Sequence, residues 1–421
     1  MSKSLTKKVY LDNNGTTHPP KSVKNKMIKA LDMGNPSSHY AKTAQKTIED
    51  FMKFLRTNLG TGVRDYELIL TSGGSESNAT IITSSVLSFK ERTGAKPHII
   101  VSSIEHKCIL KTCQSLVKKG MLECSVAKVN KQGRVSPVNI GKMIKDNTCL
   151  VTIMYANNEI GSINDIEQIA QICHKKKVPF HTDACQAWGK LKFKPKQMGV
   201  DAFSLSFHKI YGPPGIGILG IRKAFIKGYQ LEALIGGMQN NEMRGGTINF
   251  PALAGAFTGT KWFFTNRSEK NKRLAMLSNE LLNRLAEHGY KVGAYPTKSG
   301  INPTSASKMK SQRPEILLIG PKKETERMPH TLLLCIVKKT GEPFCNIDLR
   351  NALLRKGFII SIGAACNTTQ KTASHVLFAL DMPKELRCGV IRVSIGDQNT
   401  LGEIRRFART LSTYIDNVAK N

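Results

Sequence analysis

The chain has 421 residues, 40% of them hydrophobic, which is enough to bury a core in about two or three domains. No run of roughly 20 uncharged apolar residues is present and the N-terminal residues form no apolar segment, so the sequence argues against a membrane helix or a secretory signal and favours a cytoplasmic protein. The net charge of +32 predicts a lysine-rich surface with weak, non-specific nucleic-acid binding, because no basic run or recognition motif accompanies it.

Seven β-rich runs alternate with helical patterns between about residues 65 and 220. The runs are ELILTS, HIIVSS, CSVAKV, TCLVTIMYA, VPFHTD, DAFSLS and GIGILGI. This alternation predicts an α/β domain built on a mainly parallel seven-stranded sheet. Ser136-Pro137 marks one helix start, because serine can cap a helix and proline suits its first turn.

The pattern changes after Pro251. A long helical stretch runs to about Glu287, and strands follow in TLLLCIV, GFIIS and VIRVSI. A closing helix begins at Thr400, which forms a capping-box pattern with Glu403. These elements predict a second, smaller α/β domain.

We expect three parts along the chain. An N-terminal segment (1–19) packs with the small domain, a large domain spans 20–255, and the small C-terminal domain spans 256–421. Ala294–Arg327 is rich in Lys, Ser and Pro without periodicity, so we interpret most of it as a surface excursion.

The ten cysteines include no C-x-x-C pair, which argues against a disulfide framework and against a metal site. Most should be reduced core residues, as in the apolar runs around Cys149 and Cys335. Cys366 differs because it lies in ISIGAACNTTQ, a segment of small and polar residues between a strand and a helix. A thiol on such a loop can reach a substrate, so Cys366 is the candidate nucleophile.

Lys209 ends a strand and enters a glycine-proline turn in SLSFHKIYGPPG. This places it at the carboxyl edge of the sheet, where open α/β sheets bind ligands. A lysine beside Ser206 and His208 suits a Schiff base next to a phosphate, as in enzymes that use pyridoxal 5'-phosphate (PLP). Taken alone, Lys209 is explained better as a solvated loop lysine.

Two other strand ends carry groups that suit the same cofactor. Asp183 ends VPFHTD, and a buried carboxylate needs a cation such as a protonated pyridine nitrogen, although a helix cap is the alternative. Gly74 and Ser75 lie where strand ELIL passes into a helix, whose first N–H groups can hold a phosphate.

His106 and Asn157 also follow predicted strands. A lone histidine at a helix start is more often a cap or a surface residue. The position of five polar strand ends changes this interpretation, because parallel strands bring such ends to one crevice.

Together these residues resemble the NifS-like cysteine desulfurases, a class-V aminotransferase group of fold-type I PLP enzymes that includes the bacterial NifS and IscS proteins. The similarity covers nearly the whole chain, from YLDNNGTT (10–17) and GNPSS (34–38) to IRVS (391–394). It also includes GGMQ (236–239) and RGGT (244–247).

The resemblance implies a role for each candidate residue. Lys209 would carry PLP, Asp183 would pair with its pyridine nitrogen, Gln186 would face its phenolate and His106 would stack on its ring. The residues expected around the phosphate are Gly74, Ser75, Ser206 and His208.

The resemblance also implies a substrate, a dimer and a reaction. Arg392 and Asn157 would bind the carboxylate of L-cysteine, with Asn157 also close to the cofactor. Thr247 would reach the phosphate of a neighbouring subunit, which implies a homodimer with shared sites. Cys366 would take the sulfur as a persulfide, release alanine and pass the sulfur to an acceptor protein, such as an iron–sulfur scaffold.

Some positions depart from the family pattern. Cys366 follows Ala364 and Ala365 where the family usually has Ser-Ala, and Gly15 stands where alanine is usual. None of these changes removes a catalytic group. The departures and the lysine-rich surface also fit a NifS-like protein of a large DNA virus, for which the virion would be a second location.

Two other functions remain open. A PLP-dependent transaminase or a selenocysteine lyase would share Lys209, Asp183 and Arg392, but a transaminase does not need a loop thiol. A non-catalytic basic scaffold for nucleic acid or a sulfur-transfer partner would have no need to combine Lys209, Asp183, His106 and Cys366.

Overall fold

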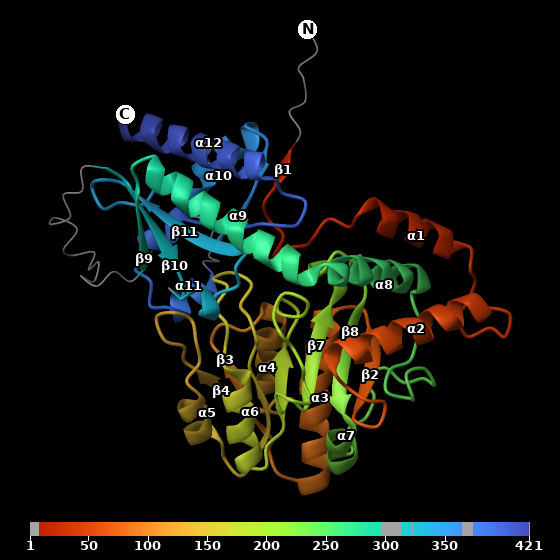
Figure 1. Cartoon of the computed structure of the whole chain (residues 1–421). Helices are drawn as coiled ribbons and strands as arrows, with labels where there is room; N and C mark the ends of the chain where they lie inside the picture. The colour runs from red at the N-terminus through yellow and green to blue at the C-terminus, as the bar shows by residue number, and fades with distance from the viewer. Residues whose placement is uncertain (1–7, 296–312, 322, 364–373, 421) are drawn as a thin grey trace.

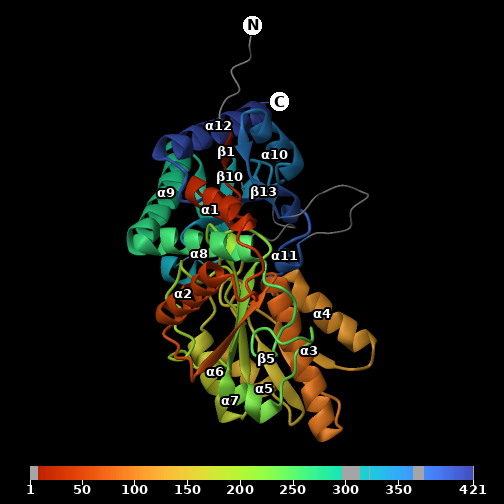
Figure 2. The same cartoon turned by 90° about the vertical axis from the view of Figure 1, so that its right-hand side faces the viewer.

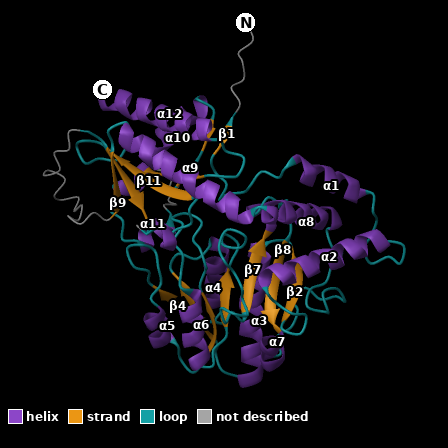
Figure 3. Ribbon diagram, in the orientation of Figure 1, coloured by secondary structure: helices purple, strands orange, loops and turns teal. Residues whose placement is uncertain are grey.

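The computed structural model describes residues 8–295, 313–321, 323–363 and 374–420. These residues form two bodies, a larger one at the bottom of Figure 1 and a smaller one above it. The strands in Figure 3 fall into two separate groups, one in each body. A seven-stranded sheet forms the larger body, and a five-stranded sheet forms the smaller one.

The large sheet has the strand order β2-β8-β7-β6-β5-β3-β4. Its strands are β2 (Tyr66–Thr71), β3 (His98–Ser102), β4 (Glu123–Ala127), β5 (Thr148–Thr152), β6 (Phe180–Asp183), β7 (Ala202–Ser206) and β8 (Gly217–Arg222). β8 runs in the opposite direction to the other six strands, which all point the same way. The prediction of a mainly parallel seven-stranded sheet is therefore confirmed.

Helices cover the large sheet and connect its strands. They are α1 (Lys21–Leu31), α2 (Lys42–Leu59), α3 (Gly74–Thr93), α4 (Lys107–Lys118), α5 (Pro137–Met143), α6 (Ile166–Lys175), α7 (Lys223–Tyr229) and α8 (Phe250–Thr265). The central strands β3, β5, β6 and β7 are buried along their whole length, since helices shield both faces. Ser136 caps α5 as predicted, by accepting a hydrogen bond from the Asn139 N–H.

The small sheet has the order β13-β14-β11-β10-β9. Its elements are α9 (Arg267–Glu287), β9 (Lys291–Tyr295), β10 (Glu315–Ile319), β11 (Thr331–Val337), α10 (Asn346–Arg355), β13 (Ser361–Ile362), α11 (His375–Ala379), β14 (Val390–Ser394) and α12 (Leu401–Lys420). The predicted capping box begins α12, because the Glu403 N–H donates to the Thr400 hydroxyl while the Thr400 N–H donates to the Glu403 carboxylate.

The chain passes from the large body to the small body at Asn266. Figure 2 shows α8 lying across the large body and α9 rising from its end to the small body. Phe250 and Phe263 of α8 belong to the core of the large sheet, whereas Leu274 and Leu281 of α9 belong to the other core. The predicted boundary at residue 255 falls inside α8, about ten residues before this change.

The N-terminal segment joins the small body. β1 (Val9–Tyr10) pairs in parallel with β12 (Phe358–Ile359), and Leu11 is buried in the small-body core. Asp12 forms a bridge with Ser394 of β14. The residues that follow then pass between the two bodies.

One interpretation of the sequence is wrong in part. β10 lies within the stretch assigned to a surface excursion, yet all five of its residues are buried between β9 and β11. Its short apolar run EILLI shows no alternation because both faces of the strand are covered.

None of the helices that the structure describes is long and apolar enough to cross a membrane.

Candidate active site

A cavity of about 410 Å³ lies at the carboxyl ends of β2, β3, β6 and β7, next to β14 of the small body. Nine of the predicted site residues line it: Gly74, Ser75, His106, Asp183, Gln186, Ser206, His208, Lys209 and Arg392. The topology explains this convergence, since parallel strands bring residues far apart in sequence to the same edge.

Lys209 ends the short 3₁₀ turn that follows β7. Its Nζ donates hydrogen bonds to the carbonyl oxygens of Asn14 and Gly15, at 2.7 and 2.6 Å. Burial lowers the pKa of Lys209 to about 8. A substantial share of the amine is therefore neutral near physiological pH, as attack on an aldehyde carbon requires.

Asp183 is buried at the end of β6 and is 6% exposed. Its Oδ2 accepts a hydrogen bond of 2.7 Å from the Asn78 amide, and its Oδ1 accepts one of 2.9 Å from the Cys185 N–H. In the described part of the chain, no Lys, Arg or His lies within ion-pair distance of Asp183. A buried carboxylate in this state can take a cationic partner from a ligand.

His106 caps α4 and is held in one orientation. Its Nδ1 accepts a hydrogen bond from the Cys108 N–H at 3.3 Å and lies 3.0 Å from the Cys108 thiol. In the neutral ring the proton therefore sits on Nε2. Although the side chain stays accessible from the cavity, desolvation lowers the pKa of His106, so the ring is mostly neutral at pH 7.

His208 lies beside the lysine and is also neutral. Burial and the charge of Lys209 lower the pKa of His208 to about 4. Its Nδ1 lies 3.1 Å from the Thr16 hydroxyl, and its carbonyl oxygen accepts hydrogen bonds from the Thr17 N–H and hydroxyl. The N-terminal segment therefore holds His208 as well as Lys209.

The N-terminus of α3 approaches the neighbouring strands too closely for side chains. A Cβ on Gly74 would lie 2.4 Å from the Cys185 thiol, and one on Gly217 would lie 2.7 Å from Gly73. Gly73 has a φ of +152°, which few other residues adopt. These glycines leave free N–H groups of the first helical turn beside Ser75 and Ser206, where an anion can bind.

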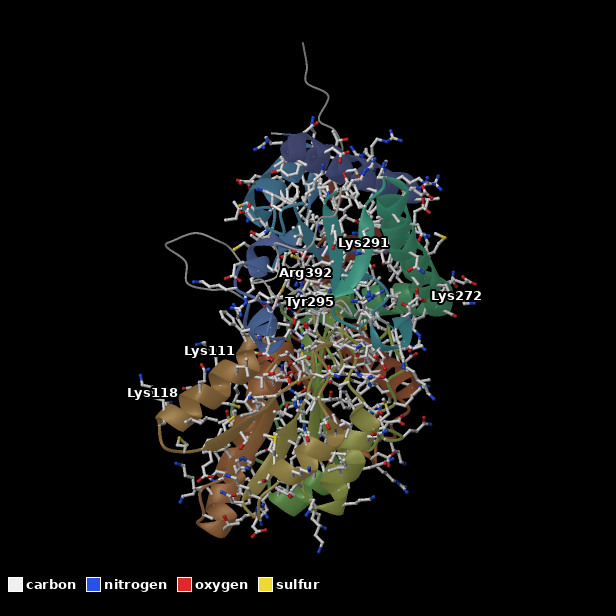
Figure 4. All side chains as sticks on the ribbon, turned by 90° about the vertical axis from the view of Figure 1, so that its left-hand side faces the viewer. Lys111, Lys118, Lys272, Lys291, Tyr295 and Arg392 are labelled. Atoms are coloured by element: carbon white, nitrogen blue, oxygen red, sulfur yellow. The ribbon has the colours of Figure 1, made fainter. Side chains whose placement is uncertain are left out.

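Arg392 contributes the cation on the small-body side. Figure 4 shows its label at the level where the two bodies meet, whereas Lys111 and Lys118 project outward from α4. Its Nη2 lies 2.6 Å from Asp12 Oδ1, and its Nη1 donates to the Asn158 carbonyl oxygen at 3.1 Å. The Nε is buried and has no hydrogen-bond partner in the structure.

Two predicted site residues, Asn157 and Thr247, do not line the described cavity, and a third is not covered by the described residues. The Asn157 side chain is buried, and it is occupied by the Ile104 carbonyl and the N–H groups of Glu159 and Ile160. Because these hydrogen bonds hold a turn, the Asn157 side chain is not placed for direct contact with a cofactor or a substrate carboxylate. Thr247 is exposed and does not line the cavity of its own chain, and Cys366 lies outside the described residues.

The cavity also contains residues to which the sequence analysis gave no role. They are Asn14, Gly15, Asn78, Met154, Asn158 and Cys185. Asn14 connects several of the others, because its carbonyl oxygen accepts from Lys209 and from Gln186 at 3.0 Å, while its side chain contacts His330 and Thr331. Asn14 and Gly15 belong to the matched segment YLDNNGTT, which was the available signal.

The protein-family model described as aminotransferase class-V matches residues 9–407. The chain belongs to the class-V aminotransferase family. A cysteine desulfurase IscS of Methanosarcina thermophila is 35% identical over 405 residues, which cover 95% of this chain and 90% of that protein. The predicted family is therefore confirmed.

Two solved structures share the class-V fold of this chain. A NifS-like protein matches with a TM-score of 0.80 and 29% identity, covering 97% of this chain and 100% of its own. SspA in complex with cysteine matches with a TM-score of 0.70 and 28% identity, covering 93% and 99%. The predicted fold-type I architecture is confirmed by these likenesses.

Class-V aminotransferases are PLP-dependent enzymes, and the cavity fits that cofactor. The buried Asp183 carboxylate has no ion-pair partner among the described residues, and the Gln186 Oε1 is buried without a hydrogen-bond partner there. The glycine-lined end of α3 suits a phosphate. Lys209 completes this set with an amine of lowered pKa.

Proposed function

We propose that the chain is a PLP-dependent cysteine desulfurase. It would convert L-cysteine to L-alanine and pass the sulfur, through a persulfide on Cys366, to an acceptor protein. The observation that carries this proposal is the buried Asp183 carboxylate, which has no ion-pair partner in the described chain and shares a cavity with Lys209 and Arg392. Relatives that are cysteine desulfurases support the choice of substrate.

The described residues suit the cofactor as follows. Lys209 would hold it covalently, Asp183 would hold its ring nitrogen protonated, and the phosphate would lie between α3 and the residues Ser206 and His208. When bound, PLP supplies an electron sink that weakens the bonds at the substrate Cα. The protein supplies orientation and charge.

The remaining groups handle the substrate and its protons. The Arg392 guanidinium is suited to an α-carboxylate. The Lys209 amine, once free, can take the α-proton, because its lowered pKa leaves it partly neutral. The neutral His106 ring offers a proton from Nε2 to a group in the cavity.

The sulfur step needs one further nucleophile. The Cys366 thiolate would attack the substrate sulfur, the C–S bond would break, and the carbon would take a proton to give alanine. No external oxidant is required, because the sulfur moves from carbon to the enzyme thiol. The nucleophile is assigned from the sequence resemblance.

Purified protein supplied with PLP and L-cysteine should form alanine and sulfide in the presence of a reductant. Cys366→Ser should retain the yellow cofactor but lose sulfur transfer, because a hydroxyl is too hard a nucleophile for sulfur. Cys345→Ser is the matched control, since Cys345 is an exposed free cysteine that does not line the cavity.

A persulfide-selective label followed by peptide mapping should place the extra sulfur on Cys366. Alanine and sulfide formed by Cys366→Ser at the wild-type rate would reject the mechanism. Amino-group exchange with a keto acid, without sulfide, would instead support the transaminase alternative.

A further inference from the structure

Arg392 is already paired with a carboxylate of its own chain. Asp12 Oδ1 lies 2.6 Å from Arg392 Nη2. The backbones of both residues are held by small-body strands, since Arg392 pairs with Leu333 and Ser361, and Asp12 bridges to Ser394. The ion pair therefore joins two points held by the small body, of which Arg392 lines the cavity.

The space for the Asp12 carboxylate comes from Gly15. The Gly15 N–H donates to the Asp12 carbonyl oxygen at 3.0 Å, so the two residues form a tight turn. A Cβ on Gly15 would lie 2.8 Å from Asp12 Oδ2 and 3.2 Å from its Cγ. Any side chain at position 15 would therefore push against the carboxylate that pairs with Arg392.

The pair also balances charge in the cavity. Lys209 and Arg392 both line it, and Asp12 offsets part of their combined positive charge. A ligand carboxylate that reached Arg392 would meet the negative charge of Asp12 on the same guanidinium. Two like charges at one site disfavour each other.

We infer that Asp12 is a built-in competitor for Arg392, which an incoming α-carboxylate has to displace and which thereby sets the affinity of the cavity for amino acids. This role rests on the proposed function, which gives Arg392 to the substrate carboxylate. It makes Asp12 a specificity-determining residue, and Gly15 the residue that makes room for it.

Binding of L-alanine and of L-alaninamide to the PLP-loaded protein tests this inference without turnover. Both carry an α-amino group, but only L-alanine carries the carboxylate. In calorimetric titrations, Asp12→Asn should bind L-alanine about two- to fivefold more tightly than the wild type, the size expected when one partly exposed ion pair is removed. L-alaninamide affinity should be unchanged.

Gly15→Ala provides a second, milder variant. It should shift the Asp12 carboxylate and tighten L-alanine binding in the same direction, while Gly402→Ala, whose added methyl group meets nothing within 4 Å, should not. Unfolding midpoints of all variants confirm that each protein is folded.

Unchanged or weaker L-alanine binding in folded Asp12→Asn would overturn the inference, because Asp12 would then orient Arg392 instead of competing for it. Equal tightening of L-alaninamide, or no L-alanine binding to any variant, would overturn it too. Tightening without desulfurase turnover of L-cysteine in the wild type would reject the proposed function and leave the competitor in place. Turnover of L-cysteine by the wild type, without tighter L-alanine binding by Asp12→Asn, would support the proposed function and reject the competitor role of Asp12.

Discussion

The surroundings of Asp183 indicate most clearly which kind of ligand the cavity can bind. Two neutral donors, the Asn78 amide and the Cys185 N–H, hold its carboxylate and leave its charge unmatched by any ion pair in the described residues. A cationic ring nitrogen is the partner that we propose for this carboxylate.

Asp183→Asn should fold and bind PLP but lose most activity, because a neutral amide cannot keep the ring nitrogen protonated. Removing one partner of a buried charge pair costs about 3–5 kcal/mol, which corresponds to a loss of about two to four orders of magnitude in kcat. Steady-state kinetics with cofactor absorbance measure both effects. Near-normal turnover in Asp183→Asn would show that Asp183 has only a structural role.

Lys190 is a buried lysine, 7% exposed, and its Nζ finds no hydrogen-bond partner among the described residues. Burial lowers the pKa of Lys190 to about 7. In the unfolded chain the pKa returns to about 10.4, so the unfolded state binds more protons between these values. The contribution of Lys190 to the free energy of unfolding therefore increases as pH rises from about 7 to 10.4, and its burial penalty is fully present below 7.

Lys190→Met keeps the length of the side chain and removes the charge. The variant should be more stable than the wild type by about 1–3 kcal/mol at pH 6, and the difference should shrink towards pH 10. Urea unfolding at both pH values measures it. Lys192→Met, at an exposed neighbour, is the control; a gain of the same size there, or one that grows with pH, would contradict the account.

The start of α3 packs closely against the turn after β6. Gly74→Ala would place a methyl group 2.4 Å from the Cys185 thiol. Overpacking of this kind costs about 1–3 kcal/mol, and here it should lower PLP affinity by shifting the first N–H groups of the helix. Equilibrium titration with PLP measures the loss.

The double variant Gly74→Ala with Cys185→Ala separates crowding from other causes. Removing the thiol frees the space, so PLP affinity should return towards that of Cys185→Ala alone. Additive losses in the double variant would show that the methyl group acts elsewhere.

The sequence predicted the strand ends well and the rest of the site poorly, for a physical reason. Gly74, Lys209 and Asp183 each end or follow a strand with a local pattern, so alternation and topology were enough to bring them together. Asn14 has no such pattern, because its partners Asn158 and Thr331 lie 144 and 317 residues away in the chain. Contacts between residues far apart in the chain produce no periodic pattern in the sequence.

The small sheet shows the same limit. β10 is flanked by residues without periodicity and is recognisable only from its pairing with β9 and β11. The end of the first core was placed about ten residues early because α8 and α9 form one continuous helical pattern. The break at Asn266, the C-cap of α8, is set by packing against two different cores.

Thr247 is exposed in the single chain. Met238 is 84% exposed and Ile235 is 44% exposed, and both lie with Thr247 in the loop between α7 and α8. We therefore expect this loop to meet a partner. A second copy of the chain, with Thr247 beside the phosphate of its partner, is the occupant that we predict.

Mixed dimers test this arrangement. Lys209→Ala and Thr247→Ala chains should each be nearly inactive alone, whereas a refolded mixture should recover activity, since one hybrid site then contains an intact lysine and an intact threonine. Sedimentation measures the oligomeric state. A fully active monomer, or no recovery in demonstrated hybrids, would contradict the shared site.

The pairing of the N-terminal segment with the small body also limits the order in which a newly made chain can fold. Its anchors, Phe358 and Ser394, are synthesised last, about 350 residues or more after Val9 and Asp12. At about 5–20 residues per second, tens of seconds pass between the synthesis of Val9 and that of Phe358, so β1 has no partner strand during that time. The contacts of the segment with the large body, from Thr17 to His208 and from Lys209 to the Asn14 carbonyl oxygen, do not depend on those late residues. We therefore expect the segment to dock first on the large body, and β1 to pair only when the small body is complete.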